Sequence, residues 1–269
     1  MVRLAAIERW LPSPLLKGSA VLHAGALAAL WHRELWPYAL GAVVSDHVLL
    51  TACGLWPRST LLGPNWTRLP AAAAADRRIA LTIDDGPDPE VTPQVLAVLE
   101  QHRARATFFC IGERVARHPA LAREIARCGH ALENHSQRHP HHFSLLGARA
   151  VAREIEHAQQ TIAEHCGSLP RFFRAPAGLR SPLLQPQLAR LGLRLASWTR
   201  RGFDTVNGDP ASVLARLRRG LGAGDILLLH DGRAARTCEG VPVIVKVLPA
   251  LLAHIAAAGL TSVTLREAL

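Results

Sequence analysis

The pattern of apolar and polar positions changes near residue 70. Before it lie two long apolar stretches, residues 19–31 and 35–56, in which Asp46 is the one acidic residue. After it, short apolar runs of strand length alternate with amphipathic segments of helix length. The chain therefore divides into a hydrophobic helical segment and a larger domain in which strands and helices alternate.

Composition sets the expected boundaries of these parts. We expect residues 1–70 to form the hydrophobic helical segment, 71–78 an alanine-rich linker and 79–269 the larger domain. Apolar runs in the larger domain predict strands at 79–83, 106–111, 172–173, 193–198, 225–229 and 262–265. Amphipathic runs predict helices that begin near Thr92–Pro93 and that cover 115–128, 151–165, 183–191, 211–221 and 243–258. Repeated strand–helix units indicate a parallel sheet or barrel.

Two adjacent carboxylates follow the first of these strands. Asp84 and Asp85 precede a Gly86–Pro87 turn, and the ends of parallel strands are where open and barrel α/β folds place their chemistry. Neighbouring side chains on a regular strand face opposite ways. Because the chain leaves the strand at Gly86, both carboxylates can reach one site.

A histidine pair follows the segment Ala131–Leu132. His135 and His139 are four residues apart, which would place both imidazoles on one side of a helical turn, where they could share a metal ion. A pair of surface histidines is the alternative interpretation. Nothing in the sequence marks the neighbouring His141 and His142 as ligands.

Three more strand ends carry polar residues. Arg174 precedes a Pro-Ala-Gly turn, and Asp204 follows the strand that ends at Trp198. The fully apolar run 226–229 delivers His230 and Asp231 at its end. Packing alone explains a charged pair at that position poorly.

In this order the blocks resemble the motifs of the polysaccharide deacetylase family, the NodB-homology carbohydrate esterases, from about residue 77 to the C-terminus. The resemblance implies an α/β fold, a distorted (β/α) barrel of about seven strands, here preceded by the hydrophobic helical segment. The run Thr82–Gly86 is similar to the first motif, which implies Asp84 as catalytic base and Asp85 as a metal ligand. The run His135–Pro140 is similar to the second, which implies His135 and His139 as the remaining protein ligands.

The other motifs imply the remaining roles. Arg174 would orient the catalytic aspartate, His230 would be the general acid, and Asp204 would tune either Arg174 or His230. The chain departs from the family pattern at Arg201, in place of a first aspartate of the fourth motif, at Thr205, in place of a tryptophan, and at Ala177, in place of an aromatic residue. These departures remove flat surfaces for sugar stacking, which disfavours a long polymer such as chitin.

Together these residues predict a metal-dependent hydrolase that removes an N-acyl group, usually acetyl, from an amino sugar of a polysaccharide or lipid-linked glycan. An Asp-His-His set leaves coordination positions open for water and a carbonyl oxygen, which fits one divalent ion, zinc. Two alternatives remain. One is another zinc hydrolase, an O-deacetylase or deformylase, and the other is a non-catalytic glycan-binding module on the same fold.

Charge and cysteine content narrow the possible partners. The net charge is +10, but the basic residues are spread along the chain and only 5% of residues are aromatic, so we expect no nucleic-acid binding. Attraction to anionic lipid headgroups fits this charge better. The five cysteines form no CxxC pair and indicate no disulfide framework.

The hydrophobic segment allows three interpretations: a helical hairpin or monotopic element in a membrane, a signal peptide ending near Ala28, or a soluble helical cap. Five tryptophans placed like an interfacial belt favour membrane association through residues 15–56. Basic residues lie both before and after the segment. By the positive-inside rule we expect a bacterial inner-membrane association with the catalytic domain facing the cytoplasm. The sequence gives no oligomeric state.

Overall fold

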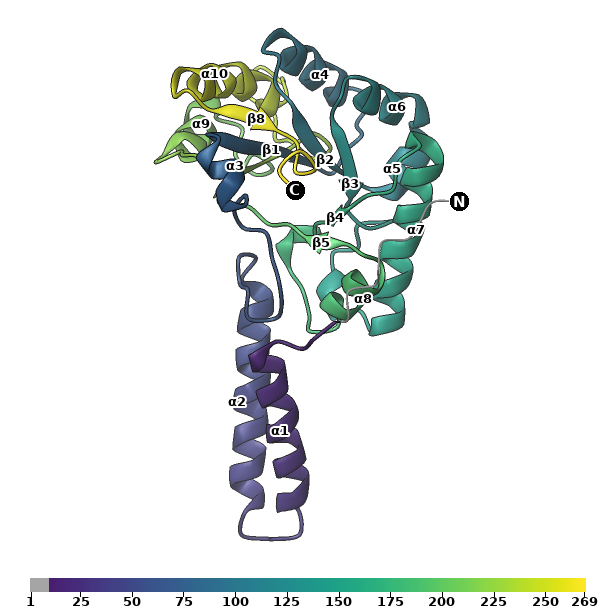
Figure 1. Cartoon of the computed structure of the whole chain (residues 1–269), viewed down its shortest axis with the longest axis vertical. Coiled ribbons are helices and arrows are strands. Elements are labelled where there is room, and N and C mark those ends of the chain that lie inside the picture. The colour runs from purple at the N-terminus through teal and green to yellow at the C-terminus, as the bar shows by residue number, and fades with distance from the viewer. Residues whose placement is uncertain (1–9) are drawn as a thin grey trace.

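A helical hairpin projects from an α/β domain in the computed structural model, which describes residues 10–269 (Figure 1). The hairpin consists of α1 (Pro14–Ala29) and α2 (Trp36–Leu55). The strands of the domain are β1 (Arg78–Asp84), β2 (Ala106–Cys110), β3 (Ala131–Asn134), β4 (Phe172–Phe173), β5 (Arg194–Leu195), β6 (Arg200–Arg201), β7 (Ile226–His230) and β8 (Thr261–Val263). Its α-helices are α3 (Ala71–Ala75), α4 (Val91–Gln101), α5 (Gly112–Arg117), α6 (Pro119–Arg127), α7 (Ala148–Cys166), α8 (Leu184–Arg190), α9 (Pro210–Arg218) and α10 (Val243–Ala257). Two short 3-10 helices, η1 (Phe143–Leu145) and η2 (Pro176–Gly178), lie in loops.

The strands form one parallel sheet that curves into an open barrel. Seven strands follow the order β5-β4-β3-β2-β1-β7-β6, and the short β8 pairs with β1 beside this path. Within residues 10–269 no pairing joins β5 to β6, so the barrel stays open. The expected α/β barrel of about seven strands is confirmed in this open form, with the hydrophobic helices preceding it.

Both faces of the central strands are buried, which explains their continuous apolar runs. Leu227 and Leu229 of β7 pack in the cluster beneath the outer helices, whereas Leu228 packs in a second cluster inside the barrel. On β1 the inner cluster contains Ala80. Because side chains alternate along a strand, Thr82 and Asp84 also point into the barrel. Asp84 lies level with Phe109 of β2 and His230 of β7 in the two neighbouring strands.

Some expected boundaries differ from the structure. The single helix expected over 115–128 is two helices, α5 and α6, because Pro119 begins a new helix and lacks the N–H that a continuous helix would use. The strand expected over 193–198 is shorter: 194–195 pair with β4, and Ala196 forms an isolated parallel bridge with Trp66. The stretch 71–78, expected as a linker, holds α3, whose Ala73 is buried, and the first residue of β1.

The hairpin helices contact each other and leave most of their side chains exposed. Exposed aliphatic and aromatic residues along it include Val21, Leu27, Trp31, Trp36, Tyr38, Leu40, Val44 and Val48. Between the helices, the Ser19 hydroxyl donates to the Asp46 carboxylate at 2.7 Å. Among the described residues one helix, Trp36–Leu55, is long and apolar enough to cross a membrane, with a mean hydropathy of 1.4. This helix is consistent with an N-terminal membrane anchor or signal segment.

The end of α2 is fixed to the α/β domain. The amide of Arg180 donates to the carbonyl of Gly54 at 3.1 Å, and a side chain at position 54 would overlap the Arg180 carbonyl oxygen. The Ser197 hydroxyl donates to the carbonyl of Pro57 at 2.5 Å. These contacts place the base of the hairpin against the loops that follow β4 and β5.

Candidate active site

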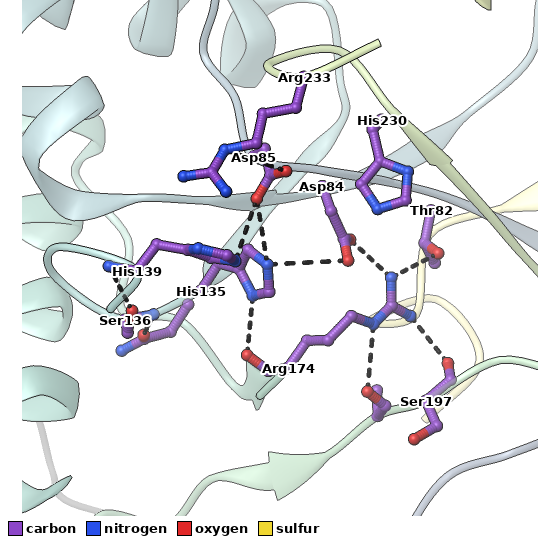
Figure 2. Close-up of polar contacts among 12 residues, drawn as sticks. Thr82, Asp84, Asp85, His135, Ser136, His139, Arg174, Ser197, His230 and Arg233 are labelled. Carbon is purple, nitrogen blue, oxygen red and sulfur yellow. Dashed lines mark hydrogen bonds and ion pairs between the residues drawn. The ribbon is translucent and has the colours of Figure 1, made fainter. Parts of the chain in front are cut away.

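The two aspartates at the end of β1 reach one site because the backbone turns at Asp85. Asp84 is the last residue of β1, and Asp85 has a left-handed backbone with φ 75°. This conformation is uncommon for a residue with a side chain and breaks the alternation of the strand. Both carboxylates therefore face the same pocket, as Figure 2 shows.

Asp85, His135 and His139 form a compact group of potential metal ligands. One ligand atom from each lies within 4.8 Å of the others, and all three residues are buried. Asp85 Oδ1 is 3.4 Å from His135 Nε2 and 3.3 Å from His139 Nε2 (Figure 2). The structure thus brings together the three residues that the sequence proposes as ligands.

The histidines come from a loop after β3 rather than from the expected helical turn. Ser136 and His139 have left-handed backbones, with φ 65° and 55°. The Asn134 side chain accepts from the Ser136 amide at 2.9 Å, and the Ser136 hydroxyl accepts from the His139 amide at 3.0 Å. His135 Nδ1 lies 2.8 Å from the carbonyl of Arg174, so this nitrogen donates and Nε2 is left free to face Asp85.

The environment of this triad fits a divalent ion. Asp85 Oδ1 is buried and has no hydrogen-bond partner among the described residues. A buried polar atom of this kind is expected where the oxygen binds a metal ion. Burial lowers the pKa of His139 to about 3, aided by the charge of His135. Burial alone would raise the pKa of Asp85, but the nearby imidazoles of His135, His139 and His230 outweigh it and hold that pKa well below its usual range. A neutral imidazole and an ionised carboxylate are the states that metal binding requires.

Asp84 is held by a buried arginine. Arg174, 1% exposed, donates from Nη1 to Asp84 Oδ1 and to the Thr82 hydroxyl, both at 2.7 Å (Figure 2). Its Nη2 donates to the carbonyl of Ser197 at 2.8 Å, and the guanidinium lies 4.1 Å from the centre of the Phe109 ring. The arrangement fixes the direction of the Asp84 carboxylate toward the pocket.

His230 is oriented by Asp204. Asp204 accepts from the His230 amide at 2.7 Å and lies 3.0 Å from His230 Nδ1. Of the two partners considered for Asp204, the structure places it against His230. Burial lowers the pKa of His230, but the hydrogen bond and charge of Asp204, with the charges of Asp84 and Asp85, outweigh burial and raise that pKa above its ordinary value.

One pocket of about 170 Å³ is lined by Asp84, Asp85, His135, His139 and His230, whereas Arg174 and Asp204 lie behind its lining. The three departures from the family pattern, Ala177, Arg201 and Thr205, line it as well. So do His141 and Arg233, which sequence analysis did not identify. Arg233 Nε lies 3.9 Å from Asp85 Oδ2. The sequence feature that could have identified Arg233 is its position three residues after His230. The loop that follows β7 begins at the pocket, so a residue this close to His230 can also reach it.

Asp231 faces away from this pocket. Its Oδ2 accepts from the Thr92 hydroxyl at 2.5 Å beneath the Gly86 turn. Burial raises the pKa of Asp231 to about 7. The carboxylate next to His230 in sequence therefore supports the turn after β1, whereas Asp204 holds the imidazole.

The chain matches the family model for polysaccharide deacetylases over residues 71–196. It is 34% identical over 181 residues to a peptidoglycan-N-acetylglucosamine deacetylase of Bacillus cereus, covering 65% of this chain and 82% of that protein. The chain belongs to the polysaccharide deacetylase family. The expected class of enzyme, a carbohydrate deacetylase, is thereby confirmed.

Two further comparisons agree with this membership. A chitooligosaccharide deacetylase of Bradyrhizobium is 40% identical over 164 residues, which cover 58% of this chain and 71% of that protein. A family 4 carbohydrate esterase from Streptomyces lividans, solved in complex with acetate, is 32% identical with a TM-score of 0.63. That match covers 70% of this chain and 92% of the other. The hairpin lies outside the residues matched by the family model.

The Asp204–His230 pair makes the pKa of His230 sensitive to one substitution. Asp204→Asn removes a charge that raises this pKa, whereas the burial that lowers it remains. We expect the pKa of His230 to fall, so that the imidazole loses its proton at a lower pH than in the wild type. Titration of the imidazole nitrogens by NMR in the metal-free protein measures this shift. An unchanged or higher pKa in the variant would contradict the electrostatic role of Asp204.

Proposed function

We propose that this deacetylase uses one zinc ion, held by Asp85, His135 and His139, to remove the acetyl group from an N-acetylated amino sugar at a membrane surface. The observation that carries the proposal is the convergence of two pre-oriented groups, Asp84 and His230, on the pocket that also holds the ligand triad. The names of two similar proteins, which specify N-acetylglucosamine in peptidoglycan and chitooligosaccharides, support an N-acetylated sugar as substrate.

A zinc ion in this ligand set would supply Lewis acidity toward the amide carbonyl and make water a stronger acid. Asp84, kept in direction by Arg174, would accept the proton of the attacking water. The backbone N–H of Ala177, in the turn that borders the pocket, would donate to the developing oxyanion. His230, with its Nδ1 against Asp204, would protonate the departing amine from Nε2. An amide needs this last proton because the free amide anion is a very poor leaving group.

The hairpin supports a substrate located at a membrane. At 1.5 Å per residue, the 20 residues of α2 are about 30 Å long, which matches the hydrocarbon core of a bilayer. The turn between the helices carries the polar residues His32, Arg33 and Glu34, which suit a position beyond that core. We propose that the hairpin inserts into the membrane and that both of its ends, with the catalytic domain, lie on the cytoplasmic side.

The proposed ligands and the proposed base can be separated by two matched variants. His139→Ala removes one ligand, so we expect metal content to fall from about one zinc per chain to a small fraction and turnover to be lost. Asp84→Asn keeps all three ligands, so we expect normal metal content with a rate lower by about 10²- to 10⁴-fold. Elemental analysis and acetate release measure the two quantities. A wild-type protein that binds no divalent ion when supplied with one, or a fully active Asp84→Asn variant, would contradict the assignment.

Membrane insertion of the hairpin is tested by charge on its exposed face. The double variant Leu40→Asp/Val44→Asp places two carboxylates in the proposed span, and a carboxylate at the centre of a bilayer costs about 2.5–3.5 kcal/mol. We expect the wild type to float with anionic lipid vesicles in a density gradient and the variant to float much less. Leu145→Asp, at an exposed leucine of the catalytic domain, serves as the control and should float like the wild type. Equal flotation of all three proteins would count against insertion.

A further inference from the structure

A second hollow adjoins the catalytic pocket on the side of the hairpin. It has a volume of about 360 Å³ and is bordered by residues 56–58 and by Trp198, Arg201 and Phe203. Trp198 and Arg201 line the catalytic pocket as well, so the two hollows share a wall. A ligand that fills both would have one end at the metal ligands and the other at the base of α2.

The second hollow carries positive charge that no carboxylate neutralises. Arg58 and Arg201 line it, and no acidic residue does. Within residues 10–269 neither arginine forms an ion pair, whereas the adjacent Arg200 is paired with Asp225 at 2.5 Å. Arg201 Nε is buried and has no hydrogen-bond partner in the described chain. An arginine with unused donors beside an active site is suited to bind an anion, because its guanidinium matches carboxylate and phosphate oxygens.

Aromatic rings hold the Arg201 guanidinium in place. Its central carbon lies 4.8 Å from the centre of the Phe203 ring and 5.7 Å from that of Trp198. Stacking of this kind stabilises the cation without occupying its hydrogen-bond donors. Arg58 reaches the same wall, where Nη1 donates to the carbonyl of Thr199 at 3.4 Å. Both cations are therefore positioned at the hollow before any ligand arrives.

An apolar groove on α2 ends one residue before this hollow in the chain. One face of α2, lined by Val44, His47, Val48, Thr51, Ala52 and Leu55, forms a groove of about 580 Å³. Leu55 at its end precedes Trp56 of the arginine hollow in the chain. The metal-binding pocket thus adjoins the cationic hollow, and the apolar groove lies on α2, which ends one residue before that hollow and which we place in the membrane.

We infer that Arg58 and Arg201 bind the phosphate of a lipid-linked N-acetylated amino sugar, with the sugar in the catalytic pocket and the lipid chain along α2. This inference rests on the proposed deacetylation and narrows its substrate class. Because the two hollows share a wall, the hydrolysed amide belongs to the sugar attached to the phosphate. The arginine at position 201 then serves as a substrate-binding residue, in a place where the family pattern has an aspartate.

The test compares three substrates: an isoprenyl-phosphate-linked N-acetylglucosamine in detergent, soluble N-acetylglucosamine 1-phosphate, and a neutral N-acetylated chitooligosaccharide. The measured quantity is the ratio of kcat/KM for each phosphorylated substrate to that for the neutral one. We expect Arg201→Gln and Arg58→Gln each to lower this ratio about tenfold, the loss of one charge-assisted contact. Arg153→Gln, at an exposed arginine of α7, should leave it unchanged.

Each outcome has a distinct meaning. If the wild type is active and the kcat/KM ratio is unchanged in both Arg201→Gln and Arg58→Gln, the phosphate subsite is overturned. The deacetylase proposal then remains intact. Soluble N-acetylglucosamine 1-phosphate turned over as well as the lipid-linked sugar would overturn the lipid part alone. A wild type that releases acetate from none of the three substrates would contradict the proposed substrate class of N-acetylated amino sugars itself.

A binding measurement tests the subsite without turnover. Trp56 and Trp198 border the hollow, so their fluorescence should report the binding of N-acetylglucosamine 1-phosphate. We expect Arg201→Gln to weaken that binding about tenfold and Arg153→Gln to leave it unchanged. Equal affinity in the wild type and Arg201→Gln would overturn the assignment, provided circular dichroism shows that the variant is folded.

Discussion

The buried ion pair between Arg174 and Asp84 holds the strands and loops of the site in place. The Arg174 guanidinium donates to Thr82 and Asp84 of β1 and to the carbonyls of Ala196 and Ser197 after β5. It thereby connects β1 to the loops after β4 and β5. Its own backbone carbonyl faces His135 Nδ1 and so fixes the orientation of that ligand. A charge at 1% exposure is tolerated only when it is paired and hydrogen-bonded. Loss of the Arg174 side chain would therefore leave Asp84 buried without the guanidinium that pairs with it.

The loops that surround this ion pair contact both the catalytic residues and the end of the hairpin. The turn after Arg174 continues to Arg180, which holds the end of α2 through the Gly54 carbonyl. The segment after β5 carries Ser197, which contacts both Arg174 and the chain that follows α2. Arg180 and Ser197 therefore set the position of the hairpin relative to the catalytic pocket, and both belong to loops that contact or contain Arg174. This short connection supports the proposal that the substrate is held at a membrane during hydrolysis.

Much of the fold and the site could be predicted from the sequence, because apolar runs that end in polar residues mark where parallel strands deliver side chains. Asp84, Asp85 and His230 stand out in this way, the role of Arg174 came from the resemblance to the family motifs, and the structure brings the four together. Backbone conformation was not predictable: the left-handed residues Ser136 and His139 replace the expected helical turn. Partners distant in sequence were also hidden. Asp204 contacts His230, and Arg58 lines the same hollow as Arg201, because the tertiary fold brings distant loops together. The local sequence pattern does not predict such contacts.

The converging residues make this protein a hydrolase of N-acetylated sugars and not a glycan-binding protein. The most direct test is to incubate the zinc-loaded wild type with N-acetylated chitooligosaccharide and with isoprenyl-phosphate-linked N-acetylglucosamine, and to follow acetate and the new primary amine by NMR and mass spectrometry. We expect equal amounts of acetate and amine, formed over many turnovers per chain. Tight binding of either glycan by the metal-loaded protein, with neither product formed, would contradict it.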